Sequence, residues 1–328
     1  MRYLGSKTLL LDQINKLVGP QPTGSVFCDP FGGIGTVGSY MKRNGFQVIS
    51  GDVLQFAHYF QRAIVQLDEV PPFFGIKHET GADVELYMNQ LSSSHGWLVE
   101  AYCEDRNFFT KENACRIQGC IDAIWKWREN QSINEDEYAF LVASLIQSMD
   151  RVANTAGTYY AYLKQFYRKA LQPFSFRFLT PVKGVCQCRS LLKDANDLVK
   201  HQECQILYLD PPYNTRDYSR YYHLPETIAK GEIPIPLGKS GVPQSRGIRS
   251  PYIQRASVET AFTELLNSCR CEMLLFHYTD NGLLSKNFIR EHLSELGELH
   301  EYYFDCKGYR TSGFSSCDNQ HHVYKVIV

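Results

Sequence analysis

The segment Leu207–Tyr213 constrains the fold most strongly, because it is an apolar run that ends in an acid, two prolines and an aromatic residue. An apolar run of this length, bounded by turn residues, indicates a buried strand of a sheet. Pro211 and Pro212 cannot continue a central strand, so the chain must leave the sheet directly after Asp210. Ligands of open α/β sheets bind at this edge, so we expect Asp210 to reach a ligand site. The alternative is a proline turn that buries Tyr213 and binds nothing.

The predicted turn offers hydrogen-bond acceptors beside an aromatic ring. Proline has no N–H, so Pro211 and Pro212 add only carbonyl oxygens next to the Asp210 carboxylate. These groups suit an amino group on a flat ring, with Tyr213 stacked on that ring. Such an amine is a poor nucleophile, because its lone pair is delocalised. Hydrogen bonds from its two hydrogens to Asp210 and to the Pro211 carbonyl would favour a pyramidal nitrogen whose lone pair is free to react.

A second ligand signal is a glycine loop between a predicted strand at residues 25–31 and a predicted helix. Gly33, Gly35 and Gly38 satisfy the G-x-G-x-x-G pattern, whose glycines let a ligand approach the backbone. This pattern fits an adenine dinucleotide or S-adenosylmethionine equally well. The next predicted strand ends at Asp52, whose carboxylate can accept both hydroxyls of the ribose that these two ligands share.

The residues before the glycines separate the two ligands. Asp29 and Pro30 stand at the end of the predicted strand, followed by Phe31. An acid and a proline at this place suit the cationic sulfonium and the amino group of a methyl donor better than they suit a pyrophosphate. We therefore favour S-adenosylmethionine over a dinucleotide.

Together these motifs resemble the alpha (Dam-like, D12) class of N6-adenine-specific DNA methyltransferases. Asp210–Tyr213 matches the Asp-Pro-Pro-Tyr catalytic motif of that class, and Asp29–Thr36 resembles its methyl-donor motif Asp-Pro-Phe-x-Gly-x-Gly-Thr. Tyr3, Gly5 and Lys7 resemble the aromatic-x-Gly-x-Lys segment that opens these proteins.

The resemblance assigns roles to single residues. The implied catalytic residues are Asp210, Pro211, Pro212 and Tyr213. The implied cofactor-binding residues are Tyr3, Gly5, Lys7, Asp29, Pro30, Phe31, Gly33, Gly35, Thr36, Asp52, Asp194 and Asp210. Asp194 follows a predicted strand, where the family has an acid near the donor's adenine, but a plain helix N-cap would look the same. No metal site is expected, and His321 and His322 are assigned to the entry of a strand.

The expected fold is an α/β fold with a Rossmann-like methyltransferase sheet and an antiparallel terminal strand, plus an inserted mainly helical module. Far more chain separates Asp52 from Asp210 than a parallel crossover needs. Residues 1–70 form the methyl-donor half, 71–185 the inserted module and 186–328 the catalytic half. A strand pair near the C-terminus, joined by residues 307–321, would supply the antiparallel edge.

Two local patterns predict particular helices. Leu9, Leu10, Ile14 and Leu17 have the spacing of one apolar helix face near the N-terminus. In the inserted module, the segment from Ser132 to Glu135 has the spacing of a capping box, which predicts a helix start before an apolar periodic run.

Charge is segregated, although the whole chain of 328 residues has a net charge of only −1. Residues 81–150 hold twelve acids against five Lys or Arg, whereas residues 151–189 hold seven Lys or Arg and no acid. Eight aromatic residues lie in the same basic span. Basic and aromatic residues together suit phosphate contacts and base stacking, although a solvated basic helix would look similar.

The segment 233–258 is a second basic stretch, with four Lys or Arg, no acid and several Gly, Pro and Ser residues. It directly follows the predicted base-binding turn, so we expect a flexible loop that closes over DNA phosphates; an exposed loop without such a role is the alternative. The candidate nucleic-acid contacts are Arg168, Lys169, Arg216, Lys239, Arg246, Arg249 and Arg255.

The predicted activity is S-adenosylmethionine-dependent methylation of adenine N6 in specific double-stranded DNA sequences, with the target base flipped out of the helix. Methylation of RNA adenine or of N4-cytosine remains open, as does a catalytically silent nucleic-acid-binding relative. The recognised sequence and a partner restriction endonuclease also stay open. Eleven cysteines without a Cys-x-x-Cys pair indicate reduced thiols, and no apolar run is long enough to span a membrane, so a cytoplasmic protein is expected.

Overall fold

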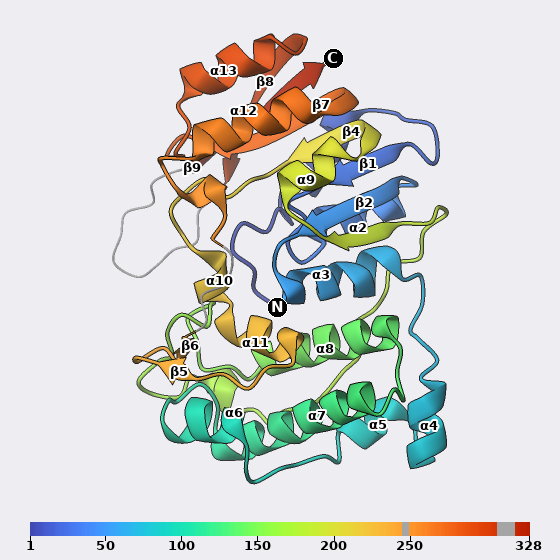
Figure 1. The fold of residues 1–328 in the computed structure, drawn as a ribbon, viewed down its shortest axis with the longest axis vertical. Coiled ribbons are helices and arrows are strands. Elements are labelled where there is room, and N and C mark those ends of the chain that lie inside the picture. Colours follow the sequence, from blue (N-terminus) through green and yellow to red (C-terminus); the bar gives the residue numbers. More distant parts are fainter. Residues whose placement is uncertain (245–248, 307–318) are drawn as a thin grey trace. The chain divides into compact units, whose positions relative to one another are not determined.

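The structure, a computed structural model, describes residues 1–244, 249–306 and 319–328. The chain forms two compact units. The sheet unit consists of Lys7–Val53, Gly184–Asp217 and Arg249–Val328. The helical unit consists of Met1–Ser6, Leu54–Lys183 and Tyr218–Ile248. Each unit is therefore assembled from segments that lie far apart in the sequence (Figure 1).

The sheet unit contains a seven-stranded sheet in the order β3-β2-β1-β4-β7-β9-β8. Its strands are β1 (Val26–Asp29), β2 (Gln47–Asp52), β3 (Arg189–Leu192), β4 (Glu203–Leu209), β7 (Arg270–Thr279), β8 (Glu298–Cys306) and β9 (Asn319–Ile327). The first five strands in this order pair in parallel, whereas β9 pairs antiparallel with both β7 and β8. This arrangement confirms the expected α/β class with antiparallel terminal strands.

Helices lie on both faces of this sheet. Its helices are α1 (Leu11–Val18), α2 (Thr36–Arg43), α9 (Ala195–Lys200), α12 (Val258–Ser268), α13 (Lys286–Ser294) and the short 3₁₀ helix η4 (Pro251–Ile253). Helices α9, α12 and α13 share an apolar core with strand residues such as Leu207, Leu209 and Phe276. Lys325, which faces the opposite side of the sheet, donates a hydrogen bond of 2.8 Å to the Leu17 carbonyl in α1.

The helical unit is built mainly from residues 55–150. Its elements are α3 (Gln55–Gln61), η1 (Arg62–Gln66), α4 (Phe74–Thr80), α5 (Val84–Met88), α6 (Trp97–Val99), η2 (Glu100–Glu104), α7 (Lys111–Glu129), α8 (Glu135–Asp150), η3 (Arg168–Leu171), α10 (Tyr218–Tyr221), α11 (His223–Lys230), β5 (Pro236–Leu237) and β6 (Val242–Pro243). Between residues 151 and 188, all of them described, η3 is the one helix. The basic span is therefore not a long solvated helix.

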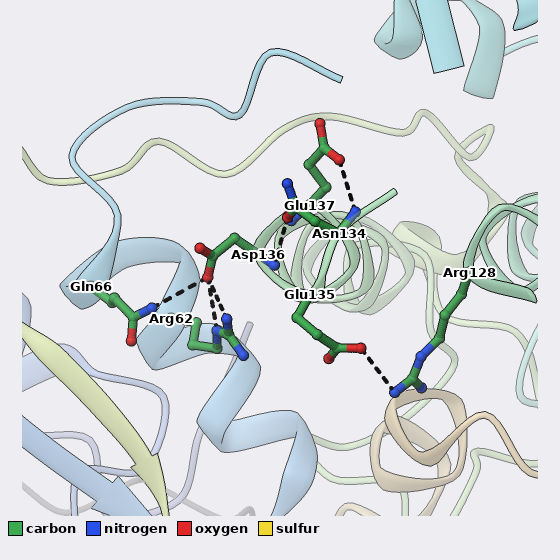
Figure 2. A network of polar contacts seen from close by, with 7 residues as sticks. All are labelled: Arg62, Gln66, Arg128, Asn134, Glu135, Asp136 and Glu137. Atoms are coloured by element: carbon green, nitrogen blue, oxygen red, sulfur yellow. Dashed lines mark hydrogen bonds and ion pairs between the residues drawn. The ribbon is translucent and has the colours of Figure 1, made fainter. Parts of the chain in front are cut away.

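The first turn of α8 corrects the predicted capping box. The cap is Asn134, whose side chain accepts the backbone N–H groups of Asp136 and Glu137, while the Glu137 carboxylate accepts the N–H of Asn134 at 3.0 Å (Figure 2). Ser132 instead donates its hydroxyl to Glu79 at 3.2 Å. The prediction was wrong by two residues, because Ser-x-x-Glu and Asn-x-x-Glu overlap here and the helix begins only after Asn134.

The same turn is tied to the π-helical segment η1. One oxygen of Asp136 accepts hydrogen bonds from the Arg62 guanidinium, at 2.5 and 3.0 Å, and from the Gln66 amide at 3.2 Å (Figure 2). Asp136 also lies in the first turn of α8, where a carboxylate interacts favourably with the helix dipole. This carboxylate therefore fixes the start of α8 against the segment that follows α3.

We expect the change Asn134→Ala to lower the free energy of unfolding by about 1 kcal/mol, because it removes the cap of α8. Urea denaturation followed by circular dichroism measures this loss. Ser132→Ala is the matched control and should cost no more than a few tenths of a kcal/mol, the scale of an exposed surface change. The reverse order of the two losses would contradict the cap that the structure shows.

The N-terminal helix also differs from its prediction. Helix α1 begins at Leu11, and it buries Ile14 and Val18. Leu10 is buried just before the helix, but Leu9 is 77% exposed. Leu9 was wrongly assigned to the apolar face, because it lies outside the helix and the helical spacing does not apply to it.

Two properties of the described residues bear on the setting of the protein. None of the helices in the described ranges has the length and apolar character needed to cross a membrane. The nine cysteines whose side chains are described are all free thiols.

Candidate active site

Three carboxylates stand at one edge of the parallel sheet. Asp29 is the last residue of β1, Asp52 the last residue of β2, and Asp210 follows directly after β4. Strand β1 lies between β2 and β4 and is parallel to both, so the three carboxyl ends point the same way. The sheet therefore gathers the predicted donor-site and catalytic acids at its ligand-binding edge.

Lys7 forms an ion pair with Asp210. Its Nζ donates to Oδ2 of Asp210 at 2.5 Å, across 203 positions of sequence. The Lys7 side chain is 5% exposed and that of Asp210 17%. Burial raises the pKa of Asp210, while the charge and the hydrogen bond of Lys7 oppose that rise. Lys7 therefore favours the ionised carboxylate at the place where the motif predicts a hydrogen-bond acceptor.

Asp29 is a buried carboxylate without full hydrogen bonding. It is 2% exposed, and within the described residues its Oδ1 has no hydrogen-bond partner. Burial raises its pKa to about 8, and the nearby charge of Asp210 adds to this rise. A buried acceptor left without a donor is costly, so Asp29 is suited to a ligand that brings a cationic N–H donor.

The glycine loop connects β1 to α2. Gly33 and Gly35 have positive φ angles of 51° and 78°, which a residue with a side chain rarely adopts. The N–H of Gly33 donates to Oδ2 of Asp52 at 3.1 Å, and Gly35 is the N-cap of α2, which begins at Thr36. The loop thus brings its backbone next to the acid that was predicted to bind a ribose.

The flanking residues Phe31 and Asp194 have clear local roles. Phe31, half-buried after the buried Pro30, meets Tyr252 edge-on with ring centroids 5.0 Å apart. Asp194 caps α9, because its Oδ1 accepts the N–H of Asn196 at 2.9 Å. Tyr252 in turn donates its hydroxyl to Asn196 Oδ1 at 2.6 Å. Asp194 is therefore the N-cap of α9, and its contact with the methyl donor stays a prediction.

The turn after β4 positions its tyrosine. Pro211 is buried and Pro212 half-buried. The ring of Tyr213 meets Tyr278 edge-on, with centroids 6.4 Å apart, and its carbonyl accepts the N–H of Leu283 at 2.9 Å. Burial and the charge of Asp210 both raise the pKa of Tyr213, so its hydroxyl stays protonated. The four motif residues thus form one ordered turn at the sheet edge.

The remaining cofactor candidates, Tyr3 and Gly5, belong to the helical unit, whereas Lys7 belongs to the sheet unit. Tyr3 stacks on Tyr222, with ring centroids 5.1 Å apart, and the N–H of Leu4 donates to the Tyr222 hydroxyl at 2.7 Å. Gly5 has a φ of 80°, which explains the glycine at this turn. Tyr222, which we did not predict, thus holds the N-terminal segment.

The candidate nucleic-acid contacts are divided between the two units. Arg168, Lys169 and Lys239 belong to the helical unit, and Arg216, Arg249 and Arg255 to the sheet unit. All except Lys169 are exposed. Lys169 is half-buried and donates to the Asp150 carbonyl at 3.2 Å, which makes it a weaker candidate for a phosphate contact. Arg246 lies outside the described residues.

The predicted basic loop contains more structure than we expected. Strands β5 and β6 pair as a short antiparallel hairpin, with Lys239 in the turn between them. Arg106 donates to the Gly238 carbonyl at 2.9 and 3.2 Å, and Tyr102 donates to that of Gly241 at 2.6 Å. The first part of this stretch is therefore an anchored hairpin.

Comparison with known proteins identifies a family for this chain. The family model "D12 class N6 adenine-specific DNA methyltransferase" matches residues 3–279. The type II methyltransferase M.FokI of Planomicrobium okeanokoites is 32% identical over 93% of this chain and 52% of its own length. The type II methyltransferase M.NlaIII of Neisseria lactamica is 32% identical over 91% of this chain and 89% of its own length. The chain therefore spans about half of M.FokI and most of M.NlaIII.

A solved structure also matches, that of magnesium protoporphyrin IX methyltransferase from Synechocystis. Its TM-score is 0.33 at 10% identity, over 98% of this chain and 80% of that one, and we base no argument on a likeness of this level. The family match, in contrast, runs from the N-terminal motif through the Asp-Pro-Pro-Tyr turn. It confirms the resemblance and the enzyme class predicted from the motifs.

Proposed function

Since the chain belongs to the D12 class N6 adenine-specific DNA methyltransferases, we propose that it transfers a methyl group from S-adenosylmethionine to the N6 amino group of adenine in DNA. The observation that carries this proposal is the Lys7–Asp210 ion pair at the carboxyl end of β4. It supplies an ionised acceptor directly before two prolines and a tyrosine, and the buried Asp29 stands at the end of the neighbouring strand.

The residues at the ends of β1 and β2 fit the methyl donor. S-Adenosylmethionine would supply an activated methyl group on a sulfonium cation. We assign Asp29, whose Oδ1 has no donor among the described residues, to its amino group. Gly33 and Gly35 let the ligand approach the backbone, and Asp52 accepts the ribose hydroxyls. Pro30, Phe31, Thr36 and Asp194 stay candidates around the same ligand. Tyr3 and Gly5 stay donor-binding candidates on the family motif alone.

We assign the target base to the turn after β4. Lys7 holds Oδ2 of Asp210, so Oδ1 is the oxygen that accepts one hydrogen of the N6 amine, and the Pro211 carbonyl accepts the other. These two acceptors draw the nitrogen toward a pyramidal geometry and make its lone pair available. Tyr213 stacks on the ring of the base. A paired base cannot enter such a turn, so the adenine must be flipped out of the duplex.

The N-terminal motif suggested that Lys7 binds the methyl donor, but we propose a different main role for it. We assign it to the catalytic carboxylate, because its ammonium group contacts Asp210 and the pair is largely buried. It keeps Asp210 ionised against the cost of burial and fixes the direction in which Oδ1 points. A contact of Lys7 with the methyl donor is compatible with this role.

The nucleic-acid substrate requires its own experiment. We propose duplex DNA over RNA, and N6 of adenine over N4 of cytosine, because the family is adenine-specific and acts on DNA. Transfer of a labelled methyl group to duplex DNA, single-stranded DNA and RNA of one mixed sequence tests the choice. Preferred labelling of duplex DNA is expected. Preferred labelling of RNA would overturn duplex DNA as the substrate. A folded chain that binds the donor but labels none of the three nucleic acids would be a catalytically silent relative of the family.

We also propose that a cognate restriction endonuclease recognises the same DNA sequence as this chain, and that methylation by the chain protects that sequence from cleavage. The relatives M.FokI and M.NlaIII are named type II methyltransferases, which supports such a pairing. DNA from cells that express the chain should resist an endonuclease of the same recognition sequence, and the Asp210→Asn variant should give no resistance.

Residues 71–185 are our candidate for the DNA-recognition region, and the exposed basic residues of both units are candidates for phosphate contacts. Neutralising Arg246, Arg249 and Arg255 together should weaken DNA binding and flatten its dependence on salt, with the slope reduced by about 0.9 for each phosphate that is no longer neutralised. Neutralising three exposed basic residues elsewhere, Lys16, Arg43 and Lys200, is the control with equal charge. An equal slope for both triple variants would remove the basic loop from the DNA interface.

Asp29→Asn should have opposite effects on donor binding and on stability. The affinity for S-adenosylmethionine should fall at least about tenfold, because a hydrogen bond to a charged group is lost. Burial raises the pKa of Asp29 to about 8, so the fold favours the protonated carboxyl group. Below the ordinary carboxyl pKa this group costs the fold nothing, but its ionisation lowers the free energy of unfolding as the pH rises through about 8. The ligand-free variant should therefore melt a few degrees higher than the wild type at pH 8.5 and equally at pH 4.

Calorimetric titration with S-adenosylmethionine and thermal melts measure the two effects. Asp197→Asn, which removes an exposed carboxylate on α9, is the control and should change neither. A variant that melts higher at pH 8.5 but binds the donor normally would remove Asp29 from the donor site.

A further inference from the structure

A row of polar side chains crosses the sheet on the face that carries Asp210. Tyr208 is two positions before Asp210, so both point to the same side of β4. Tyr208 is paired in register with Leu275 of β7, and His277 follows two residues later on the same face. His277 is opposite Val323 of β9, which places His321 on that face as well.

These side chains form one hydrogen-bonded chain. The Tyr208 hydroxyl and Nδ1 of His277 are 3.1 Å apart, and Nε2 of His277 is 2.8 Å from Nδ1 of His321. Tyr208 and His277 are each only 1% exposed, and His321 is half-buried. A neutral imidazole carries one N–H, so His277 donates one of its two hydrogen bonds and accepts the other, and the chain needs no charge.

The groups around the chain keep it neutral. Burial, with the carboxylates of Asp210 and Asp29, raises the pKa of Tyr208, which therefore keeps its proton. Burial and then the positive charge of Lys7 lower the pKa of His277 far below its ordinary value. The same two causes lower the pKa of His321 to about 4. His322 adds a smaller effect of the same sign on both rings, and His321 adds one on His277.

We propose that His277 and His321 are positioning residues for Lys7, forming an uncharged polar wall, anchored by Tyr208, that keeps the Lys7 ammonium directed at Asp210. This inference rests on the proposed role of the Lys7–Asp210 pair at the target amine. A second positive charge in the wall would repel Lys7 and compete with it for the carboxylate. An apolar wall would leave the buried hydroxyl of Tyr208 without a partner.

The same charges argue against a proton path through this chain. A path toward His321 would have to place the proton of the methylated amine on His277 and His321. Burial and the Lys7 charge both oppose that protonated state. The chain is therefore suited to hold position and not to carry charge.

Two substitutions of His321 separate charge from packing. His321→Gln keeps a neutral hydrogen-bonding group. Its kcat should therefore stay within about twofold of the wild type, a difference no larger than the usual scatter between independent changes. His321→Arg adds a fixed positive charge and should lower kcat about tenfold or more, with KM for DNA and for S-adenosylmethionine unchanged. In the Lys7→Met background, the added charge should cost no more than about twofold. Equal losses in both backgrounds would overturn the inference.

A measurement that does not depend on activity completes the test. Titration of the imidazole groups by NMR should show a higher pKa for both His277 and His321 in Lys7→Met than in the wild type, because a nearby cation is removed. His58 is the internal control, since burial and Arg62, not Lys7, lower its pKa to about 4. Unchanged titration of both rings would overturn the inference and leave methyl transfer standing. A wild type that methylates no DNA would overturn the proposed function and leave the titration result standing.

Discussion

Replacing Asp210 by Asn lowers kcat for methyl transfer to DNA by a factor on the order of 10²–10³, the cost of removing one preorganised electrostatic group from an active site. Asn has the same size, but its amide is a weaker acceptor than a carboxylate and leaves the buried Lys7 without its ion pair. The affinity for S-adenosylmethionine should fall much less. Single-turnover methylation together with calorimetric binding of the donor measures both effects.

The control for this variant is Asp197→Asn, which removes an exposed carboxylate from α9 and should leave kcat unchanged. A folded Asp210→Asn variant with kcat near that of the wild type would mean that Asp210 is not an acceptor for the target amine. A variant that loses donor binding and catalysis to the same degree would place Asp210 in the donor site alone.

Replacing Lys7 by Met lowers kcat roughly 10- to 100-fold, since a hydrogen bond to a charged group contributes about 1.5–3 kcal/mol. It also shifts the acid limb of the pH profile. Lys7 opposes the rise that burial causes in the pKa of Asp210, so its removal raises that pKa further. Because the proposed reaction uses the ionised carboxylate, activity should be lost at a higher pH in Lys7→Met than in the wild type. The pH dependence of kcat measures this shift.

Lys7→Arg is the conservative companion of this variant. It keeps the positive charge, so the acid limb should return toward its wild-type position even if the geometry lowers kcat. An acid limb that moves equally in Lys7→Met and Lys7→Arg, or in neither, would show that the charge of Lys7 does not tune Asp210.

The sequence alone was sufficient for the features that depend on one segment. The apolar run before Asp210 and the prolines after it predicted a buried strand and its end, and the structure has β4 end at Leu209. The glycine pattern predicted a strand, a loop and a helix, which are present as β1, the loop with Gly33 and Gly35, and α2. In each case the backbone restrictions of proline and glycine act locally, so neighbouring residues suffice to infer the conformation.

Features that depend on distant segments were not predicted. The partner of Lys7 lies 203 positions away, and no local pattern reports such a pair. Tyr208 looked like one more apolar residue of a buried run, and His321 like a strand entry. Their link through His277 depends on the register of β4, β7 and β9. This register is set by packing of the whole sheet, so a single sequence does not reveal it.

Two local errors have an equally physical origin. The sequence offers overlapping cap motifs at Ser132 and Asn134, and only the position of the helix start decides between them. Leu9 has the right spacing for an apolar face, but spacing has no meaning outside a helix. Both errors concern element boundaries, where small differences in capping energy decide the outcome.

The measurement that tests the central claim most directly is nucleoside analysis of mixed-sequence duplex DNA after incubation with the wild-type chain and S-adenosylmethionine that carries a labelled methyl group. The account predicts that the label appears in N6-methyladenine and that Asp210→Ala gives essentially none. Label in N4-methylcytosine, or no label in DNA from a folded chain that binds the donor, would contradict it.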